Sequence, residues 1–279
     1  MSYKIIGDSC ADLPKELRED PHFVLVPLTL IVDGVAITDD ETFNQVDFLN
    51  KVQASPNCPK SACPSPEDYM KHFDSDGDVY VVTLSSQLSG SYNSAELAKK
   101  LYLEEHPDKK VEIIDSRSAS IGQTLIALKI KELAETGQHS FETIVEKAHA
   151  FRDGLKTKFV IESLDTLRKN GRLSNLQAII CSALNIKPVM GATSEGTICK
   201  LDQSRGIIKA LVTMVKLIEE DVIRPQERTL GIAHCNNLER ALFVKEEILK
   251  RIPFRDCFIV NTAGVSSLYA NEGGIITAY

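Results

Sequence analysis

Short apolar runs alternate with longer segments of helical periodicity through the first half of the chain. Residues 3–8, 79–83 and 111–115 have the length and β-branched content of buried strands. A predicted helix follows each of them, starting near Pro14, passing through Glu96, and covering residues 120–136. Alternating strands and helices predict a parallel sheet, whose ligands gather beyond the carboxyl ends of its strands. Polar residues follow all three strands, where this rule expects a site.

The segment between the first two of these strands predicts a hairpin, a helix and a loop. Residues 23–37 hold two apolar stretches divided by Asp33-Gly34, a pair that favours a tight turn, and residues 42–52 have helical periodicity. Residues 55–66 contain four prolines in twelve positions, so we expect a loop without helix or strand. Ser65 followed by a first-turn proline is typical of a helix start.

The second half continues the alternation after an amphipathic helix predicted over residues 141–155. The Asp153-Gly154 break is the predicted boundary between a domain of residues 1–154 and a domain of residues 155–279. Strands are predicted at 158–163, 186–190, 197–201, 229–233, 257–261 and 274–278. Helices are predicted at 164–172, 176–184, 207–223 and 238–251. Both halves therefore predict an α/β domain.

The loop after the second strand, which reads LSSQLSGSYNSA from residue 84, is rich in hydroxyl groups. It leads into a predicted helix, whose N-terminal amides and dipole favour an anion. Its donors are Ser85, Ser86, Ser89, Ser91 and the Gly90 amide. No lysine or arginine lies between residues 80 and 98, so the loop suits one carboxylate better than a polyphosphate. The alternative is that Ser89 or Ser91 only caps the helix, the commonest role of a hydroxyl there.

Composition and charge exclude several classes of protein. The 279 residues are 43% hydrophobic and 25% charged, as is ordinary for a globular chain. The net charge of −7 argues against a nucleic-acid or anionic-membrane surface. No apolar run approaches the roughly 20 residues of a membrane span. The start, MSYKIIGDS, has neither a basic nor a long apolar segment, so we expect a cytoplasmic protein without stable membrane insertion.

The sequence predicts neither a metal site nor a cofactor. Seven scattered cysteines without a C-x-x-C pair fit reduced thiols better than disulfides or zinc ligands. Asp74, Asp76 and Asp78 resemble a calcium loop but lack its closing glutamate, which favours a solvated turn. Neither of the glycine motifs that bind nucleotides occurs.

A hydrolase is an alternative function without its usual motif. A serine or cysteine nucleophile needs a base that an acid orients, and His234 is the one histidine positioned like a site residue. No G-x-S-x-G elbow is present, although Ser89 or Cys63 is a candidate nucleophile. Arg172 and Arg205 stand out as cations because each lies near a glycine where the chain turns; either can instead pair with a surface acid.

Several motifs together resemble those of the DegV family over nearly the whole chain. Asp8-Ser9 with Asp12-Leu13 is similar to the family's D-S-x-x-D-L, and residues 60–66 are similar to K-T-S-Q-P-S-P. Residues 84–95 are very close to S-S-x-L-S-G-T-Y-x-S-A, the most specific of these motifs. The remaining matches are Asp115-Ser116 at the third strand end, residues 167–173 with L-x-K-G-G-R-I, and residues 186–188 with K-P-I.

The resemblance implies a two-domain DegV-like fold. A three-layer N-terminal domain around a parallel sheet would precede a two-layer α/β domain with a mixed sheet. Members of the family bind a fatty acid, and some carry the acyl chain for a bacterial fatty acid kinase. The resemblance places the carboxylate on Ser61, Ser89 and the Gly90 amide, with the acyl chain in a tunnel between the domains.

Two positions depart from the family's pattern. Cys63 ends the sequence Ser-Ala-Cys where the family often has T-S-Q, and Tyr269 falls on the family's histidine. A phenol donates a hydrogen bond to a carboxylate but is not a cation near neutral pH. The change at Tyr269 is therefore compatible with lipid binding.

These observations predict a fatty-acid carrier without catalytic residues of its own. Its expected partners are a long-chain fatty acid and an ATP-dependent fatty acid kinase, which would hold the nucleotide. A third interpretation is a protein-interaction module with an empty pocket. A predicted secondary site comprises Asp8, Ser9, Ser86, Asp115, Arg172, Arg205 and Tyr269.

Overall fold

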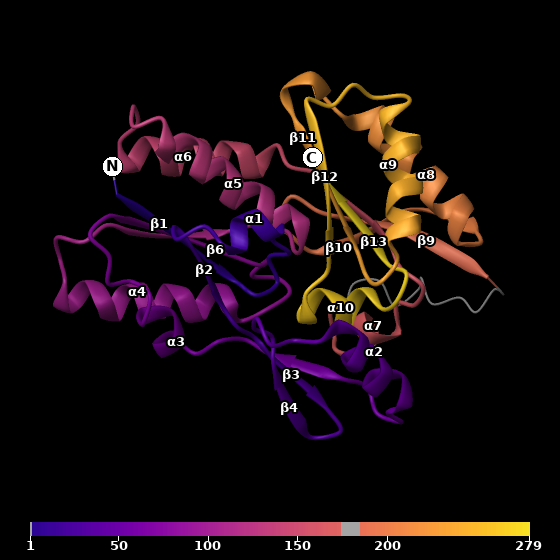
Figure 1. Ribbon diagram of the computed structural model, residues 1–279, viewed down its shortest axis with the longest axis horizontal. Helices are drawn as coiled ribbons and strands as arrows, with labels where there is room; N and C mark the ends of the chain where they lie inside the picture. Colours follow the sequence, from indigo (N-terminus) through magenta and orange to yellow (C-terminus); the bar gives the residue numbers. More distant parts are fainter. Residues whose placement is uncertain (1, 174–184) are drawn as a thin grey trace.

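The computed structural model describes residues 2–173 and 185–279 and contains two main β-sheets (Figure 1). The first sheet has four parallel strands in the order β2-β1-β6-β7. They are β1 (Tyr3–Asp8), β2 (Phe23–Val26), β6 (Asp78–Thr83) and β7 (Val111–Asp115). The parallel sheet expected from the alternating pattern is confirmed. The helix predicted over residues 176–184 lies outside the described residues.

The register of the first sheet brings the polar ends of its strands to one edge. Gly7 pairs with Val82, and Thr83 pairs with Asp115, so the carboxyl ends of β1, β6 and β7 lie side by side. The loops that follow these strands therefore share one edge of the sheet.

Helices cover both faces of the first sheet and give this half three layers (Figure 1). On one face, α5 (Ile121–Glu135) and α6 (Phe141–Asp153) bury apolar side chains such as Ile126 against Tyr80. On the other face, α3 (Pro66–Met70) and α4 (Ser91–Glu105) bury Tyr69 and Ala98 against Val81. The periodic apolar positions of the helices form these two cores because their burial removes apolar surface from water.

The second sheet is mixed, with six strands in the order β10-β9-β8-β13-β11-β12. Only β11 and β12 pair in parallel; the other neighbours are antiparallel. The strands are β8 (Thr157–Val160), β9 (Ile186–Ala192), β10 (Ile198–Arg205), β11 (Thr229–His234), β12 (Asp256–Asn261) and β13 (Ile275–Ala278). The predicted combination of a parallel and a mixed sheet is confirmed.

Helices α8 (Ile207–Asp221) and α9 (Leu238–Leu249) cover one face of the second sheet, where Met214 and Val244 pack against Ile232. The opposite face turns toward the first half, and α5 contacts β11 and β13 there as well as β1 and β6. One helix therefore belongs to the cores of both halves (Figure 1).

A third, small antiparallel sheet in the order β4-β3-β5 corrects one prediction. Its strands β3 (Thr29–Val32) and β4 (Val35–Thr38) form the expected hairpin, with Asp33 and Gly34 at positive φ in the turn. The proline-rich segment was expected to hold no strand, but β5 (Lys60–Ala62) pairs with β3. Its residues lie between Pro59 and Pro64, so they keep the N–H groups that a ladder needs.

The remaining elements connect the sheets. They are α1 (Lys15–Arg18), α2 (Gln45–Ala54), α7 (Asp165–Lys169), the 3-10 turn η2 (Pro225–Glu227) and α10 (Gly264–Ala270). Helix α10, which was not predicted from the sequence, contacts α2, α7 and β3 and so joins the two halves. Among the described residues, no helix is both long and apolar enough to cross a bilayer.

Candidate functional site

An apolar cavity lies between the strand ends of the first half and the inner face of the second sheet. Its empty space is about 870 Å³, counting the part that is open to solvent. The small sheet, α7 and α10 complete its walls. Apolar side chains dominate the lining and include Leu28, Leu84, Phe159, Ile161, Val265 and Ile276.

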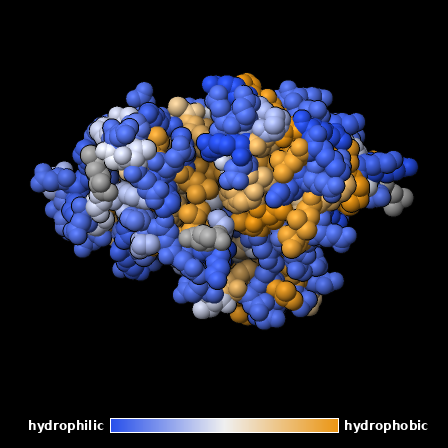
Figure 2. Space-filling view, turned by 45° about the horizontal axis from the view of Figure 1, so that its top comes forward, coloured by the Kyte–Doolittle hydropathy of each residue, from blue (hydrophilic) through white to orange (hydrophobic). Residues whose placement is uncertain are grey.

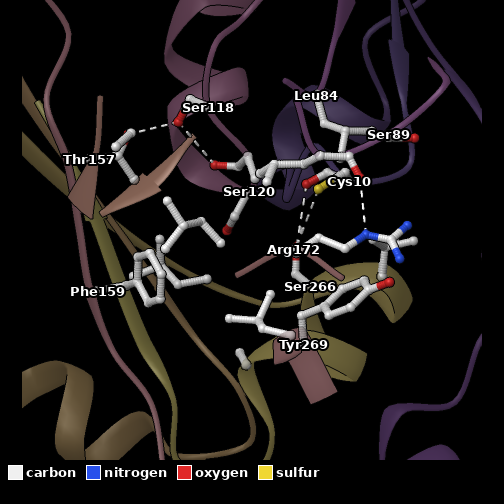
Figure 3. A pocket seen from close by; sticks show the side chains of 18 of the residues that line it. Cys10, Leu84, Ser89, Ser118, Ser120, Thr157, Phe159, Arg172, Ser266 and Tyr269 are labelled. Carbon is white, nitrogen blue, oxygen red and sulfur yellow. Dashed lines mark hydrogen bonds between the residues drawn. The ribbon is translucent and has the colours of Figure 1, made fainter. Parts of the chain in front are cut away.

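Polar groups gather at one end of this cavity (Figure 3). Ser61 on β5 and Tyr269 on α10 share a hydrogen bond of 3.0 Å between their hydroxyl oxygens. Ser89, from the loop before α4, lines the same cavity, as does Arg172. The Cζ atom of Arg172 lies 5.6 Å from the centre of the Tyr269 ring, where a cation and an aromatic ring attract each other.

Arg172 is held by backbone carbonyls and keeps its positive charge uncompensated among the described residues. Its Nε donates to the carbonyl of Leu88 at 3.1 Å, and its Nη1 donates to the carbonyl of Asn170 at 2.5 Å. The first bond ties the residue to the serine-rich loop. A guanidinium fixed in this way adds a positive charge to an end whose loop sequence alone offered only neutral donors.

The start of α4 positions Ser89 and Gly90. Gly90 is the N-cap residue, and the structure gives it no side-chain cap, while the Ser89 hydroxyl accepts from the Ser91 amide at 3.2 Å. Ser89 therefore touches the helix start and also lines the cavity. A β-carbon at Gly90 would lie 3.1 Å from the sulfur of the exposed Cys63, so this backbone packs closely against that thiol.

The other end of the cavity carries a second pair of hydroxyls (Figure 3). Ser118 and Thr157 lie 2.7 Å apart by their side-chain oxygens and join the loop after β7 to the first residue of β8. In Figure 3, Phe159 lies below Thr157, on the side away from Arg172 and Tyr269. The cavity is thus a mainly apolar space with hydroxyl groups at each end.

Residues behind the cavity hold its loops in place. Asp8 is completely buried and accepts hydrogen bonds from the Leu84 amide at 2.9 Å and from Gln123 at 3.0 Å. Burial raises the pKa of Asp8 to about 6. Asp115 accepts from the amides of Ser86 at 3.1 Å and Arg117 at 2.9 Å. These carboxylates shape the strand ends and do not line the cavity.

The structure thus separates the predicted site residues into two sets. Ser61, Ser89, Arg172 and Tyr269 line the cavity at one end. Asp8, Ser9, Ser86, Asp115 and Arg205 lie outside its lining, as does Gly90, which stands directly after Ser89. Arg205 is the last residue of β10 and exposed.

The carboxylate that places α10 was not predicted from the sequence. Asp39 is buried and accepts from the amides of Gly264 at 2.7 Å and Val265 at 2.8 Å, and from the Ser9 hydroxyl at 2.9 Å. Burial raises the pKa of Asp39. Asp12 adds a bond of 2.6 Å from the Ala263 amide. Asp12 and Asp39, both in the first half, therefore accept hydrogen bonds at the start of α10, a helix of the second half. In the sequence, Asp12 belongs to a family motif, whereas Asp39 is marked only by its position after an apolar run.

Among the residues that the structure describes, neither candidate nucleophile, Ser89 or Cys63, has a hydrogen bond to a side chain that could act as its base. Ser89 bonds to a backbone amide, and His234 accepts from the Asn237 amide at 3.1 Å through Nδ1, outside the cavity lining. Burial lowers the pKa of His234. In the part of the chain that the structure describes, no group of three or more His, Cys, Asp or Glu side chains is arranged to hold a metal.

A comparison with protein-family models identifies the family. The model described as "Uncharacterised protein, DegV family" matches residues 2–278. The chain belongs to the DegV family. A DegV domain-containing protein of Streptococcus pneumoniae R6 is 37% identical over all of this chain and 99% of its own length. The family resemblance seen in the motifs is confirmed.

Solved structures of DegV proteins superpose on the whole chain. One from Ruminococcus gnavus, with vaccenic acid, is 46% identical with a TM-score of 0.97, covering 100% of this chain and 99% of its own. The Fatty Acid Kinase (Fak) B3 protein of Streptococcus pneumoniae, loaded with linoleic acid, is 36% identical with a TM-score of 0.91. The match covers 100% of this chain and 99% of that protein. A DegV protein from Eubacterium eligens, loaded with heptadecanoic acid, is 31% identical with a TM-score of 0.91 over 99% of each chain.

Proposed function

We propose that this DegV protein binds a long-chain fatty acid in the cavity between its halves. The observation that carries the proposal is an apolar space with Ser61, Ser89, Arg172 and Tyr269 at one end. Those residues would hold the carboxylate, with the Gly90 amide beside them, and the apolar walls would hold the acyl chain. The fatty acids bound to three similar structures support this assignment.

The physical magnitudes favour retention of such a ligand. Burial of one CH₂ group contributes about 0.8 kcal/mol, so sixteen carbons give roughly 12 kcal/mol before association and ordering costs of several kcal/mol. A carboxylate additionally needs donors when it leaves water, and the hydroxyls and the guanidinium at the polar end are such donors. The ligand is therefore expected to remain bound during purification.

The protein would act as a carrier and not as an enzyme. In this proposal it shields the acyl chain and presents the carboxylate to a fatty acid kinase, which alone holds ATP and Mg²⁺, in the cytoplasm. The similarity to the Fak B3 protein supports a kinase partner. The fatty acid is the only ligand that the proposal requires, and no cofactor takes part.

The test is native mass spectrometry of the purified protein, followed by denaturing extraction and identification of the released molecule. A stoichiometric fatty acid is the expected result, and its mass gives the chain length. Ser61→Ala combined with Ser89→Ala should reduce fatty-acid retention. Ser204→Ala is the matched control, because its hydroxyl bonds Thr213 at 2.8 Å outside the cavity lining. A bare protein that also fails to take up added fatty acid would sink the proposal.

A further inference from the structure

A second hollow lies where the two halves meet and shares no lining residue with the fatty-acid cavity. Helices α5 and α6 form one wall, and the segment from η2 to the start of β11, together with Arg255, forms the other. Its empty space is about 800 Å³, counting the part that is open to solvent. Figure 2 shows apolar surface beside strongly hydrophilic residues at the junction of the halves.

The residues that line this hollow carry a net positive charge. Its lining contains four cations and two acids: Lys129, Arg224, Arg228 and Arg255, with Glu132 and Glu227. Lys129 pairs with Glu132 at 3.0 Å, and Arg224 pairs with Glu227 at 3.1 Å. Two positive charges are left over, in a protein whose net charge is −7. The excess is therefore local to this hollow and does not follow from the composition of the chain.

The two remaining cations are held by neutral acceptors. Arg228 donates through Nε to the carbonyl of Ile223 at 2.9 Å and through Nη1 to the carbonyl of Gly154 at 3.0 Å. Arg255 donates through Nη2 to the Thr229 hydroxyl at 3.1 Å. Neither guanidinium has an ion-pair partner among residues 2–173 and 185–279. Their backbones adjoin, because the Arg255 amide donates to the Arg228 carbonyl at 3.0 Å.

A structural role accounts for only part of this arrangement. The bonds of Arg228 fasten the η2 segment to the end of α6 across the two halves, which uses two of its five N–H donors. Arg255 is exposed and uses one donor. Both guanidinium groups line this hollow and keep donors that can bind the oxygens of an anion, and the two bonds that already hold Arg228 lower the ordering cost of binding.

We propose that Arg228 and Arg255 form a binding site for an oxyanion, the phosphate or carboxylate group of a small molecule. The facing wall is apolar, with Leu125, Leu128 and Phe151, so the site also fits an apolar portion of that molecule. The site is independent of the proposed fatty-acid cavity, because the two share no lining residue.

The test is calorimetric titration of the full-length protein with sodium phosphate and, separately, with sodium acetate, at an ionic strength held constant with sodium chloride. Saturable binding of at least one of the two anions is expected. Arg255→Gln should weaken it about tenfold or more, since hydrogen bonds to charged groups are the strong ones. Arg251→Gln is the matched control, because Arg251 already pairs with Glu247 at 3.0 Å and removal of its charge leaves the hollow intact.

Each outcome decides the proposal. Binding of phosphate alone assigns a phosphate group, and binding of acetate alone assigns a carboxylate; loss in Arg255→Gln but not in Arg251→Gln supports the site in either case. Absence of saturable binding by both anions overturns the proposal, and so does equal affinity in the two variants. Arg255 is exposed and makes a single side-chain bond, so Arg255→Gln is expected to fold and to melt at the temperature of the control.

Discussion

The hydroxyl groups of Ser61 and Tyr269 are 208 positions apart in the sequence and 3.0 Å apart at the polar end of the cavity. Ser61 is on the short strand β5 and Tyr269 is on α10, so the contact joins the small sheet to the last helix. Each hydroxyl has one proton, so a carboxylate that accepted from both would replace the hydrogen bond between them while the two oxygens kept their positions. Under the proposed function, ligand binding would therefore depend on the position of α10.

Tyr269→Phe should weaken fatty-acid binding by about 2- to 10-fold, because a hydrogen bond between neutral groups contributes about 0.5–1.5 kcal/mol. The ring remains, so its contact with Arg172 is retained. Displacement of a fluorescent fatty acid measures the change. Tyr3→Phe, which removes a hydroxyl bonded to Glu135 at 3.4 Å, is the control and should bind like the wild type. An unaltered affinity in Tyr269→Phe would place the carboxylate elsewhere.

Arg172→Gln should weaken binding about tenfold or more and should also reduce its dependence on salt. The guanidinium supplies the positive charge at this end, and charge-assisted hydrogen bonds contribute about 1.5–3 kcal/mol. Arg172→Lys keeps the charge and should retain part of the salt dependence. Affinities at low and high sodium chloride check both points. A glutamine variant with the salt dependence of the wild type contradicts the assignment of Arg172.

Asp39→Asn should lower the free energy of unfolding by about 1–3 kcal/mol and should also weaken fatty-acid binding. An amide in place of this carboxylate turns an NH₂ group toward donors, since Asp39 accepts from two amides and a hydroxyl. Urea unfolding and ligand displacement measure the two effects. The neighbouring Asp40→Asn is the matched control, because the Asp40 side chain bonds to Thr42 within its own turn and to no other described residue. Equal stability of the two variants would show that Asp39 does not hold α10.

Asp8 should make the protein more stable in mild acid than at neutral pH. Its pKa is about 6 when folded against an ordinary value of 3.8, so the folded chain binds this proton more tightly than the unfolded chain does. The contribution is fully present below the unfolded pKa and is lost as pH rises through 6, by at most about 3 kcal/mol. Urea unfolding from pH 4 to 7 should show a difference between wild type and Asp8→Asn that shrinks as pH rises.

The control for this pH effect is Asp20→Asn. Burial opposes ionisation of Asp20, but hydrogen bonds from Lys131 and His22 dominate and lower the pKa of this carboxyl to about 2. Asp20 is therefore ionised in the folded chain between pH 4 and 7. Most of the change that its ionisation causes in the free energy of unfolding takes place below pH 4. Its variant should differ from the wild type by a nearly constant free energy above pH 5. A constant difference for Asp8→Asn as well would mean that its pKa is ordinary.

Local patterns were sufficient to predict the two sheets. Strands such as residues 79–83 are rich in β-branched residues and are followed by hydroxyl-bearing residues. In a parallel sheet, the register then brings the carboxyl ends of neighbouring strands to one edge. The loop after β6 could be singled out for the same reason. Ser61 and Ser89 came from motifs, and the fold brings both to one cavity.

Long-range contacts explain what the sequence did not predict. Helix α10 has seven residues, GVSSLYA, which carry no clear helical period, and its place depends on Asp12 and Asp39 at separations of 251 and 225 residues. The strand β5 needed β3 as a partner to form within a proline-rich segment. Arg172 reaches the polar end through the Leu88 carbonyl, 84 residues away. None of these partners is visible in a local window of sequence.

The position of α5 bears on how a bound ligand can leave. Ile121, its first residue, is completely buried, and a β-carbon at Gly231 of β11 would lie 2.3 Å from that side chain. Rotation of one half away from the other would pull these surfaces apart and expose apolar positions of the helix to water. The two sheets therefore share α5 as a common wall. A fatty acid bound as proposed would then exchange through local movement at the rim of the cavity, while the contact between α5 and β11 stays closed.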